Sequence, residues 1–434
     1  MCGIVGFVDQ KKKKEKLKIV KDMADQIIHR GPDGEGYFCD DVVALGHRRL
    51  SIIDVSGGGQ PIFNEDKTKV IIFNGEIYNY ASLKDELLEL GYQFQTKTDT
   101  EVILHGYEAF GDELFARLRG MFSFVIYDTK TKELVGARDH FGMKPFYYYL
   151  KDQEFLFASE IKSMLVHPNF QKEINKDALK MYLIFQYSVK EETFFKNVYK
   201  LKPGHYFHYK DGNLDIKPYF ELEYHKNSNK SYDEMKLELQ KVLEDSIYYH
   251  QTTSDVEVGA YLSGGVDSSY VVSFAKPDKT FSVGFSYEGF DETDYASDLS
   301  KMLGIKNYRK KISPEDFFEA LPRVQWHTDE PHANLSTVPL YFLSELTAEQ
   351  VKVCLSGEGS DEMFGGYNEY NDPTLLKIYL KFPLFFRKFV RTICKHLPHF
   401  PGRNTLILYG LPFNKRYIGH LWKQMMQIRY WRMI

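Results

Sequence analysis

Short apolar runs separated by turn-forming residues fill the first half of the chain, a pattern typical of β-strands. The runs that predict strands are Ile4–Val8, Val42–Leu45, Val70–Phe73, Phe122–Tyr127 and Phe155–Ala158. Turn-forming clusters at 128–132, 151–152 and 211–212 predict hairpins between antiparallel strands. Apolar residues also recur every three or four positions in two stretches that end before a glycine, which predicts helices over Ala81–Leu90 and Glu101–Phe110. We therefore expect sheets with helices packed outside them.

The pattern changes after a polar stretch at 225–231, which has nothing to bury. A helical pattern over Tyr232–Ile247 leads to a strand at Val256–Leu262, a glycine-containing loop, a short helix and a strand at Thr280–Phe285. This βαβ order, with a further strand at Val351–Leu355, predicts a parallel sheet that binds ligands beyond the carboxyl ends of its strands. We expect two domains, residues 1–222 and 232–434, joined by a linker at 223–231.

Charge is distributed unevenly along the 434 residues. No Asp or Glu follows Asp372, whereas twelve of the 56 Lys and Arg residues do, so residues 1–372 carry 44 basic against 60 acidic side chains. A basic final segment could meet nucleic acid or a membrane, or it could form cationic faces of surface helices beside an acidic body. We favour the second interpretation and expect no nucleic-acid or membrane partner.

The four cysteines lie far apart, without the spacing of a disulfide framework or a zinc site. The sequence contains neither a signal-peptide pattern at its start nor 18 consecutive uncharged apolar residues. A cytoplasmic location is therefore expected.

Cys2 is the first candidate for chemistry. If Met1 is removed, one residue carries both a thiol and a free α-amine, whose pKa near 8 suits it to accept the thiol proton. Taken alone, a cysteine near a terminus is more often a small apolar core residue than a nucleophile.

Five motifs lie in the same half of the chain as Cys2: His29–Gly34, Arg48–Ile52, Asn74–Asn79, Thr98–Glu101 and Ala137–Gly142. In order and spacing they resemble the class II glutamine amidotransferases. The resemblance implies an N-terminal-nucleophile hydrolase fold, an αββα sandwich of two antiparallel sheets between helical layers. Followed by a parallel-sheet α/β domain for an adenine nucleotide, this makes a two-domain protein of mixed α/β and α+β class.

The matched positions suit the binding and hydrolysis of glutamine. Arg49 can grip the α-carboxylate and Asp99 the α-ammonium, while Asn74 and Gly75 can form an oxyanion hole beside Cys2. The resemblance implies a glutamine-binding set of Arg49, Leu50, Ser51, Ile52, Ile53, Asn74, Gly75, Glu76 and Asp99. The alternative makes Asn74-Gly75 a hairpin turn, and Arg49 and Asp99 surface charges.

A second candidate site follows the strand that ends at Leu262. Ser263, Gly264, Gly265, Val266, Asp267, Ser268 and Ser269 precede a helix. The two glycines let backbone N–H groups face an anion, the serines add donors, and the helix N-terminus adds partial positive charge. The loop lacks the lysine of a Walker A motif and resembles the pyrophosphate loop of ATP pyrophosphatases, in which Asp267 would help hold Mg²⁺. A generic Gly-rich turn would explain the glycines alone.

Leu355–Glu362, followed by Phe364–Tyr367, resembles the second signature of the asparagine synthetase family. The resemblance implies ATP contacts from Leu262, Val283, Ser356 and Gly357. It makes Glu358 the residue that supports acyl-adenylate formation and deprotonates ammonia, and Asp361 a second Mg²⁺ ligand. The alternative has these carboxylates capping a helix near Ser360.

The family resemblance also implies a reaction: glutamine, aspartate and ATP give glutamate, asparagine, AMP and pyrophosphate through a β-aspartyl-adenylate. Segments 329–331 and 336–339 resemble its substrate side. Residues 158–163 resemble the interface along an ammonia tunnel. A homodimer is plausible. Relatives in the family continue past residue 419 into further helices, so we expect the second domain to be incomplete.

Because the second domain is expected to be incomplete, three alternatives stay open. The chain could activate a sugar acid or a peptide carboxylate in place of aspartate. It could be a glutaminase alone if the second domain is inactive. It could also be a non-enzymatic protein whose basic tail binds a partner.

Overall fold

The computed structural model describes residues 1–9, 13–223, 229–287, 291–367 and 374–410. The chain divides into two compact units. One contains residues 1–178 and 190–357, and the other contains residues 179–189 and 358–434. The expected linker at 223–231 and the basic tail beyond residue 410 lie wholly or partly outside the described residues.

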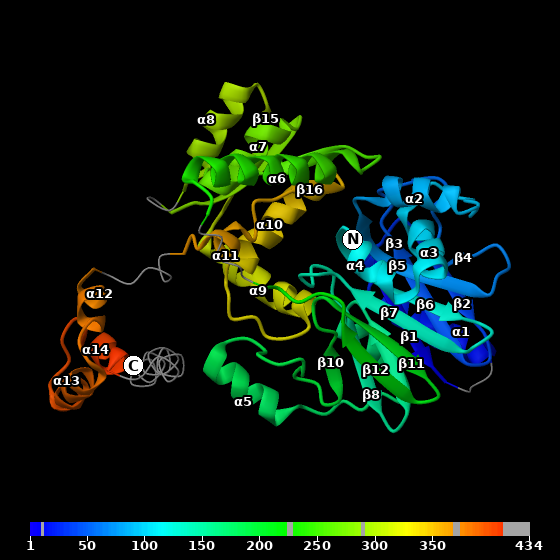
Figure 1. Ribbon diagram of the computed structural model, residues 1–434, viewed down its shortest axis with the longest axis horizontal. Coiled ribbons are helices and arrows are strands. Elements are labelled where there is room, and N and C mark those ends of the chain that lie inside the picture. Colours follow the sequence, from blue (N-terminus) through cyan, green and yellow to red (C-terminus); the bar gives the residue numbers. More distant parts are fainter. Residues whose placement is uncertain (10–12, 224–228, 288–290, 368–373, 411–434) are drawn as a thin grey trace. The chain divides into compact units, whose positions relative to one another are not determined.

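Two antiparallel sheets, each with six strands in the described chain, form the first part of the larger unit (Figure 1). The first runs in the order β10 (Val198–Lys200), β8 (Tyr147–Lys151), β9 (Glu154–Ala158), β1 (Gly3–Val8), β3 (Val43–Arg49), β2 (Gly34–Cys39). The second runs in the order β12 (Asn213–Pro218), β11 (His205–Lys210), β7 (Glu133–Arg138), β6 (Gly120–Asp128), β5 (Lys69–Ile77), β4 (Ile62–Phe63). The three expected hairpins join β6 to β7, β8 to β9 and β11 to β12.

The two sheets pack face to face and helices cover their outer faces. Apolar side chains of β1, β3 and β9 meet those of β5, β6 and β7 in one buried cluster. A second cluster joins the outer face of the first sheet to α1 (Lys13–Asp25), and a third joins the second sheet to α2 (Tyr80–Glu89) and α3 (Asp99–Phe110). The predicted αββα sandwich is confirmed.

Helix α3 begins where its sequence allows a cap. The hydroxyl of Thr98 accepts the N–H of Glu101, which satisfies one of the free donors of the first turn. Gly111 ends the helix with a φ of 57°, a conformation that glycine adopts without strain. Capping thus fixes Asp99 as the first residue of the helix, beside the end of β5.

The rest of the larger unit is built on a four-stranded parallel sheet. Its strand order is β15 (Lys306–Ile312), β14 (Lys279–Phe285), β13 (Val258–Tyr261), β16 (Val353–Leu355). The helices of this region are α6 (Tyr232–Thr252), α7 (Val266–Ala275), α8 (Thr293–Leu303), α9 (Pro314–Thr328) and α10 (Thr337–Ala348). Ile247, Val272 and Ala296 of three of these helices pack with Ala260 and Leu355 of the sheet. The predicted α/β order is confirmed.

The order in which the strands are added to this parallel sheet reverses at β13. From β13 the chain winds outward through β14 to β15, and then returns to place β16 on the other side of β13. The carboxyl ends of β13 and β16 therefore flank a topological switch point, where open α/β sheets bind their ligands.

Shorter elements complete the described chain: η1 (Ile28–Arg30), η2 (Gly111–Glu113), α4 (Leu114–Arg117), η3 (Ile161–Val166) and α5 (Lys176–Phe185). The smaller unit contains α11 (Ser360–Phe364), α12 (Thr374–Leu380), α13 (Leu384–His396) and α14 (Arg403–Tyr409). In the part of the chain that the structure describes, no helix has both the length and the apolar character needed to cross a membrane.

Candidate active sites

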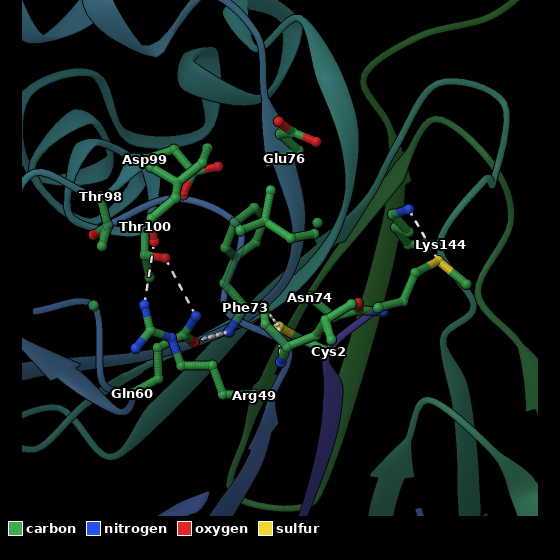
Figure 2. A pocket seen from close by; sticks show the side chains of 16 residues that line it. Cys2, Arg49, Gln60, Phe73, Asn74, Glu76, Thr98, Asp99, Thr100 and Lys144 are labelled. Carbon is green, nitrogen blue, oxygen red and sulfur yellow. Dashed lines mark hydrogen bonds between the residues drawn. The ribbon is translucent and has the colours of Figure 1, made fainter. Parts of the chain in front are cut away.

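Cys2 lies directly before β1 and lines a cavity of about 60 Å³ in the antiparallel part of the molecule (Figure 2). β3 and the loop after it, β5, the first residues of α3, and Lys144 enclose this cavity. Its lining residues are Met1, Cys2, Arg49, Leu50, Ile52, Ile53, Gly58, Gln60, Phe73, Asn74, Gly75, Glu76, Thr98, Asp99, Thr100 and Lys144. The structure thus brings together eight of the nine residues expected to bind glutamine.

The ninth, Ser51, does not line the cavity. Its side chain is buried, and its backbone N–H donates to Oδ2 of Asp33 at 2.9 Å. This hydrogen bond fixes the chain between Leu50 and Ile52, which both face the cavity, so Ser51 supports the wall from behind.

The thiol of Cys2 is held by one neighbouring residue. The backbone N–H of Leu50 donates to Sγ at 3.4 Å, and Sγ lies 3.6 Å from the Leu50 carbonyl oxygen. Burial raises the pKa of the Cys2 thiol, and the Leu50 N–H opposes that rise because it stabilises the thiolate.

Met1 precedes Cys2 in this structure, so the Cys2 nitrogen is an amide. Burial lowers the pKa of the Met1 α-amine to about 5, so this amine is neutral at pH 7. Met1 itself lines the cavity, and its sulfur lies 3.1 Å from Nζ of Lys144. Loss of Met1 would therefore enlarge the cavity beside Cys2.

Asn74 and Gly75 lie within β5, paired with Ser123 and Phe122 of β6. The hairpin-turn interpretation of these two residues is therefore wrong. The Asn74 side chain is fully buried, and neither its oxygen nor its nitrogen has a hydrogen-bond partner among the described residues. A buried amide without a partner costs free energy, which is explained if the cavity holds a ligand that bonds to it.

Two carboxyl groups, Glu76 and Asp99, line the cavity. Asp99 is 4% exposed, so it is not a surface charge, and its Oδ2 accepts the Ile77 N–H at 2.9 Å. Burial raises the pKa of Asp99 to about 7, and burial together with the charge of Asp99 raises the pKa of Glu76 to about 7. A ligand ammonium would favour the ionised form of both groups.

Arg49 supplies the opposite charge. Its Nη2 donates to the carbonyl oxygens of Ile53 and Asp54, at 3.1 and 2.6 Å, which orient the guanidinium. Within the described chain Arg49 forms no ion pair, so its charge is available to a carboxylate. The cavity therefore contains a cation and two carboxyl groups beside a thiol, the charge pattern of a site for a free amino acid.

Sequence reasoning missed several cavity residues. Gln60 connects two walls, because its Oε1 accepts the Phe73 N–H at 2.7 Å and its Nε2 lies 3.3 Å from Oγ1 of Thr100. Burial lowers the pKa of Lys144, the second cation of the cavity. Thr98 and Thr100 flank Asp99 in a recognised motif and could have been included, whereas no local pattern marked Gln60 or Lys144.

The second candidate site lies at the switch point of the parallel sheet. The loop after β13 turns at Gly264, whose φ of 88° suits glycine, and Gly265 caps the start of α7. Oγ of Ser263 accepts the Gly265 N–H at 3.2 Å and lies 3.0 Å from Oγ of Ser268. These bonds shape the loop at the N-terminus of α7. Asp267 lies exposed in the first turn of this helix, and Ser269 follows two residues later.

The loop after β16 approaches this first loop closely. A Cβ on Gly357 would lie 2.9 Å from the Ser268 nitrogen, so glycine is needed for the contact, and Ser356 precedes it at the end of β16. Leu262 is buried beneath the loop and Val283 lies within β14. Glu358 and Asp361 belong to the smaller unit, with Asp361 in the first turn of α11.

The segment expected on the substrate side carries two ion pairs. Oδ1 of Asp329 lies 2.8 Å from Nζ of Lys162, and Oε2 of Glu330 lies 2.7 Å from Nζ of Lys200. Both lysines belong to the antiparallel part of the larger unit. Residues 331–336 are exposed.

Comparisons with known proteins cover the segments that contain the two candidate sites. A family model described as a glutamine amidotransferase domain matches residues 1–220, which contain the Cys2 cavity. A model described as asparagine synthase matches residues 238–404, which contain both loops of the parallel sheet. The chain is 43% identical to asparagine synthetase [glutamine-hydrolyzing] 1 of Bacillus subtilis, over 97% of this chain and 67% of that protein.

The chain belongs to the family of glutamine-hydrolysing asparagine synthetases. It is also 36% identical to a putative member of this family from Methanocaldococcus jannaschii, over 92% of this chain and 81% of that protein. Among solved structures, the glutamine phosphoribosylpyrophosphate amidotransferase of B. subtilis aligns with a TM-score of 0.39 and 16% identity, over 71% of this chain and 65% of that one.

Proposed function

We propose that this chain is an ATP-dependent ligase that makes asparagine from aspartate with ammonia taken from glutamine. The observation that carries the proposal is the cavity in which the Cys2 thiol lies with the unpartnered amide of Asn74 and the charges of Arg49 and Asp99. The proposal assigns residues 1–222 to glutamine hydrolysis and residues 232–434 to aspartate activation.

The first half-reaction releases ammonia. Arg49 binds the glutamine α-carboxylate, and Asp99, with Glu76 beside it, binds the α-ammonium, which directs the side-chain amide toward Cys2. The α-amine freed by removal of Met1 accepts the thiol proton, and the thiolate attacks the amide carbon. Asn74 and the Gly75 N–H stabilise the oxyanion, ammonia leaves, and water releases glutamate from the thioester.

The second half-reaction consumes ammonia. The loop from Ser263 to Ser269 binds the ATP phosphates while Ser356 and Gly357, with Leu262 and Val283, hold the rest of the nucleotide. The aspartate β-carboxylate displaces pyrophosphate to give the acyl-adenylate, and ammonia, deprotonated by Glu358, displaces AMP.

Mg²⁺ fits the donors of this second site. Asp267 offers an exposed carboxylate oxygen beside the phosphate loop, the hard ligand that this ion prefers. We assign Asp267 and Asp361 to Mg²⁺, whose charge would neutralise the phosphates. A homodimer and a cytoplasmic location complete the proposal, and family resemblance and composition alone support them.

The test is product analysis by mass spectrometry with ¹⁵N-amide glutamine, aspartate, ATP and Mg²⁺. We expect labelled asparagine and AMP in equal amounts. In Cys2→Ala we expect AMP and asparagine only when ammonium is supplied, and that asparagine should be unlabelled. Labelled ammonia without AMP or asparagine would overturn the ligase proposal and leave a glutaminase. Amidation of a sugar acid or a peptide carboxylate, but not of aspartate, would reassign the acceptor.

A further inference from the structure

A chain of charged side chains joins the turn after α9 to the nucleophile. Oδ1 of Asp329 lies 2.8 Å from Nζ of Lys162, which also contacts Oε2 of Glu160. Oε1 of Glu160 accepts Nη1 of Arg30 at 3.0 Å, and Nε of Arg30 donates to the Cys2 carbonyl oxygen at 2.9 Å. Every step from the Asp329 carboxylate to the Cys2 backbone is a direct polar contact.

All four of these side chains are nearly excluded from water. These four side chains are between 6 and 9% exposed, so none can exchange its partner for solvent without cost. Burial alone would raise the pKa of Glu160, but the His29 hydrogen bond and the charges of Arg30 and Lys162 lower it to about 2. The carboxylate therefore stays ionised, and movement of one charge leaves the next one uncompensated.

Asp329 is held in an unusual backbone conformation. It ends α9 with a φ of 60°, which is strained for a residue with a side chain, and its Oδ2 accepts the Ile161 N–H at 2.5 Å. The exposed turn at 331–336 follows and leads into α10, which packs against β14 and β15. One end of this turn is thus attached to the nucleotide-binding sheet and the other to Lys162.

We infer that Glu160, Lys162 and Asp329 are positioning residues. They act through Arg30, and they set the position of the Cys2 backbone according to the conformation of the turn at 331–336. This inference rests on the proposed function, since the turn lies on the side of the molecule assigned to the acceptor. Binding at the acceptor site then promotes glutamine hydrolysis, and ammonia is made when it can be used.

The neighbouring residue provides a matched control. Glu330 also pairs with a lysine of the antiparallel part, Lys200, at 2.7 Å, and its Oε1 accepts the Phe194 N–H at 3.0 Å. Asp329 and Glu330 therefore make the same kinds of contact from adjacent positions. The Asp329 pair continues to Cys2 through the contacts of Lys162, Glu160 and Arg30.

The experiment compares Asp329→Asn with Glu330→Gln in the full chain. Each substitution removes a charge and keeps an oxygen that accepts the backbone N–H. The first readout is the rate at which 6-diazo-5-oxonorleucine, a reactive glutamine analogue, alkylates Cys2. We expect this rate to fall about tenfold in Asp329→Asn and to change less than twofold in Glu330→Gln.

The second readout is the ratio of glutamate to asparagine formed with all substrates present. We expect Asp329→Asn to lose the stimulation of glutaminase by aspartate plus ATP and to raise the ratio several-fold.

We call the series of contacts from Asp329 to Cys2 the relay. Equal effects of Asp329→Asn and Glu330→Gln on Cys2 alkylation would overturn the inference that this relay positions Cys2. The first readout needs no synthetase activity, so it separates this inference from the proposed function. If the wild type makes no asparagine while Asp329→Asn still slows alkylation, the proposed function fails and the relay stands. If the wild type makes asparagine and the two variants behave alike, the relay fails alone.

Discussion

The backbone nitrogen of Leu50 lies 3.4 Å from Sγ of Cys2 and donates to it. The preceding residue is Arg49, which we assign to the substrate carboxylate. The two groups that position the nucleophile and the substrate are therefore separated by one peptide unit at the end of β3. Because a peptide unit is planar and stiff, the Leu50 N–H and the Arg49 Cα keep a fixed separation, and hydrogen bonds to the Ile53 and Asp54 carbonyl oxygens orient the guanidinium from there.

Asp99→Asn should stabilise the folded protein and weaken glutamine binding. The pKa of Asp99 is raised from 3.8 to about 7, so its contribution to folding is present below pH 4 and is lost as pH rises through 7. Asparagine does not titrate. We expect the variant to be more stable than the wild type by about 2 kcal/mol at pH 8, with no gain at pH 4, measured by urea unfolding without glutamine.

The same variant should bind glutamine poorly, because the ammonium loses its buried counter-charge. A KM for glutamine raised by roughly 10- to 100-fold is expected. We expect the KM of the wild type to rise below pH 7, as Asp99 is protonated, and we expect the variant to lose that rise. An unchanged KM would show that Asp99 does not bind the substrate.

Asn74→Ala should lower kcat for glutamine hydrolysis by about 10² to 10³, the usual effect of losing one oxyanion donor. Its melting temperature should not fall, because the Asn74 amide has no partner among the described residues. Ammonium-dependent asparagine formation serves as the control and should be unchanged. A large loss of stability would contradict the assignment and indicate a structural role.

His105→Gln should destabilise the protein in a pH-dependent way. Burial opposes the charged imidazole, but Glu101 and Glu108 outweigh it and raise the pKa of His105 from 6.5 to about 9. The stabilisation is fully present below pH 6.5 and is lost as pH rises through 9. We expect the variant to lose about 2 kcal/mol at pH 6 and almost nothing at pH 10. Equal losses at both pH values would show that packing, not charge, is responsible.

Gly264→Ala should impair the nucleotide site alone. A Cβ at Gly264 would lie 2.8 Å from Cβ of Tyr295, at a φ of 88° that already disfavours alanine. Gly304→Ala is the matched control, because Gly304 has a φ of 72° with no atom within 4 Å of the added carbon. We expect AMP formation to fall at least tenfold in the first variant and less than twofold in the second. Glutamine hydrolysis should stay within twofold of wild type in both.

The sequence predicted the elements whose apolar pattern is uninterrupted. Strands β1, β5, β6 and β9 and helix α3 lie where the spacing of apolar residues indicated them. Helix α1 was not predicted, because lysines dominate its sequence. Lys16 is nevertheless buried there, with Nζ bonded to the Asp9 carbonyl oxygen at 3.0 Å. Burial of a lysine depends on a distant acceptor, which local pattern cannot show.

The sequence predicted the motif residues that line the Cys2 cavity better than the residues that hold the cavity together. Asn74 and Asp99 belong to sequence motifs, and both line the cavity as expected. Gln60 and Lys144 reach the cavity only because the sheets and loops fold together, and the contact between Lys162 and Asp329 joins positions 167 residues apart. Such pairings arise from tertiary structure and leave no periodic signal.

The pairing of β13 with β16 has a consequence for synthesis on the ribosome. Val258 and Val353 face each other across this pair although roughly 95 positions separate them, whereas all residues around Cys2 precede residue 145. Domains fold as they emerge, N-terminal part first. A nascent chain therefore has its thiol cavity before the ATP loops exist and before Asp329 has been translated. During that interval the growing polypeptide would have a glutaminase site without the contact that we propose regulates it.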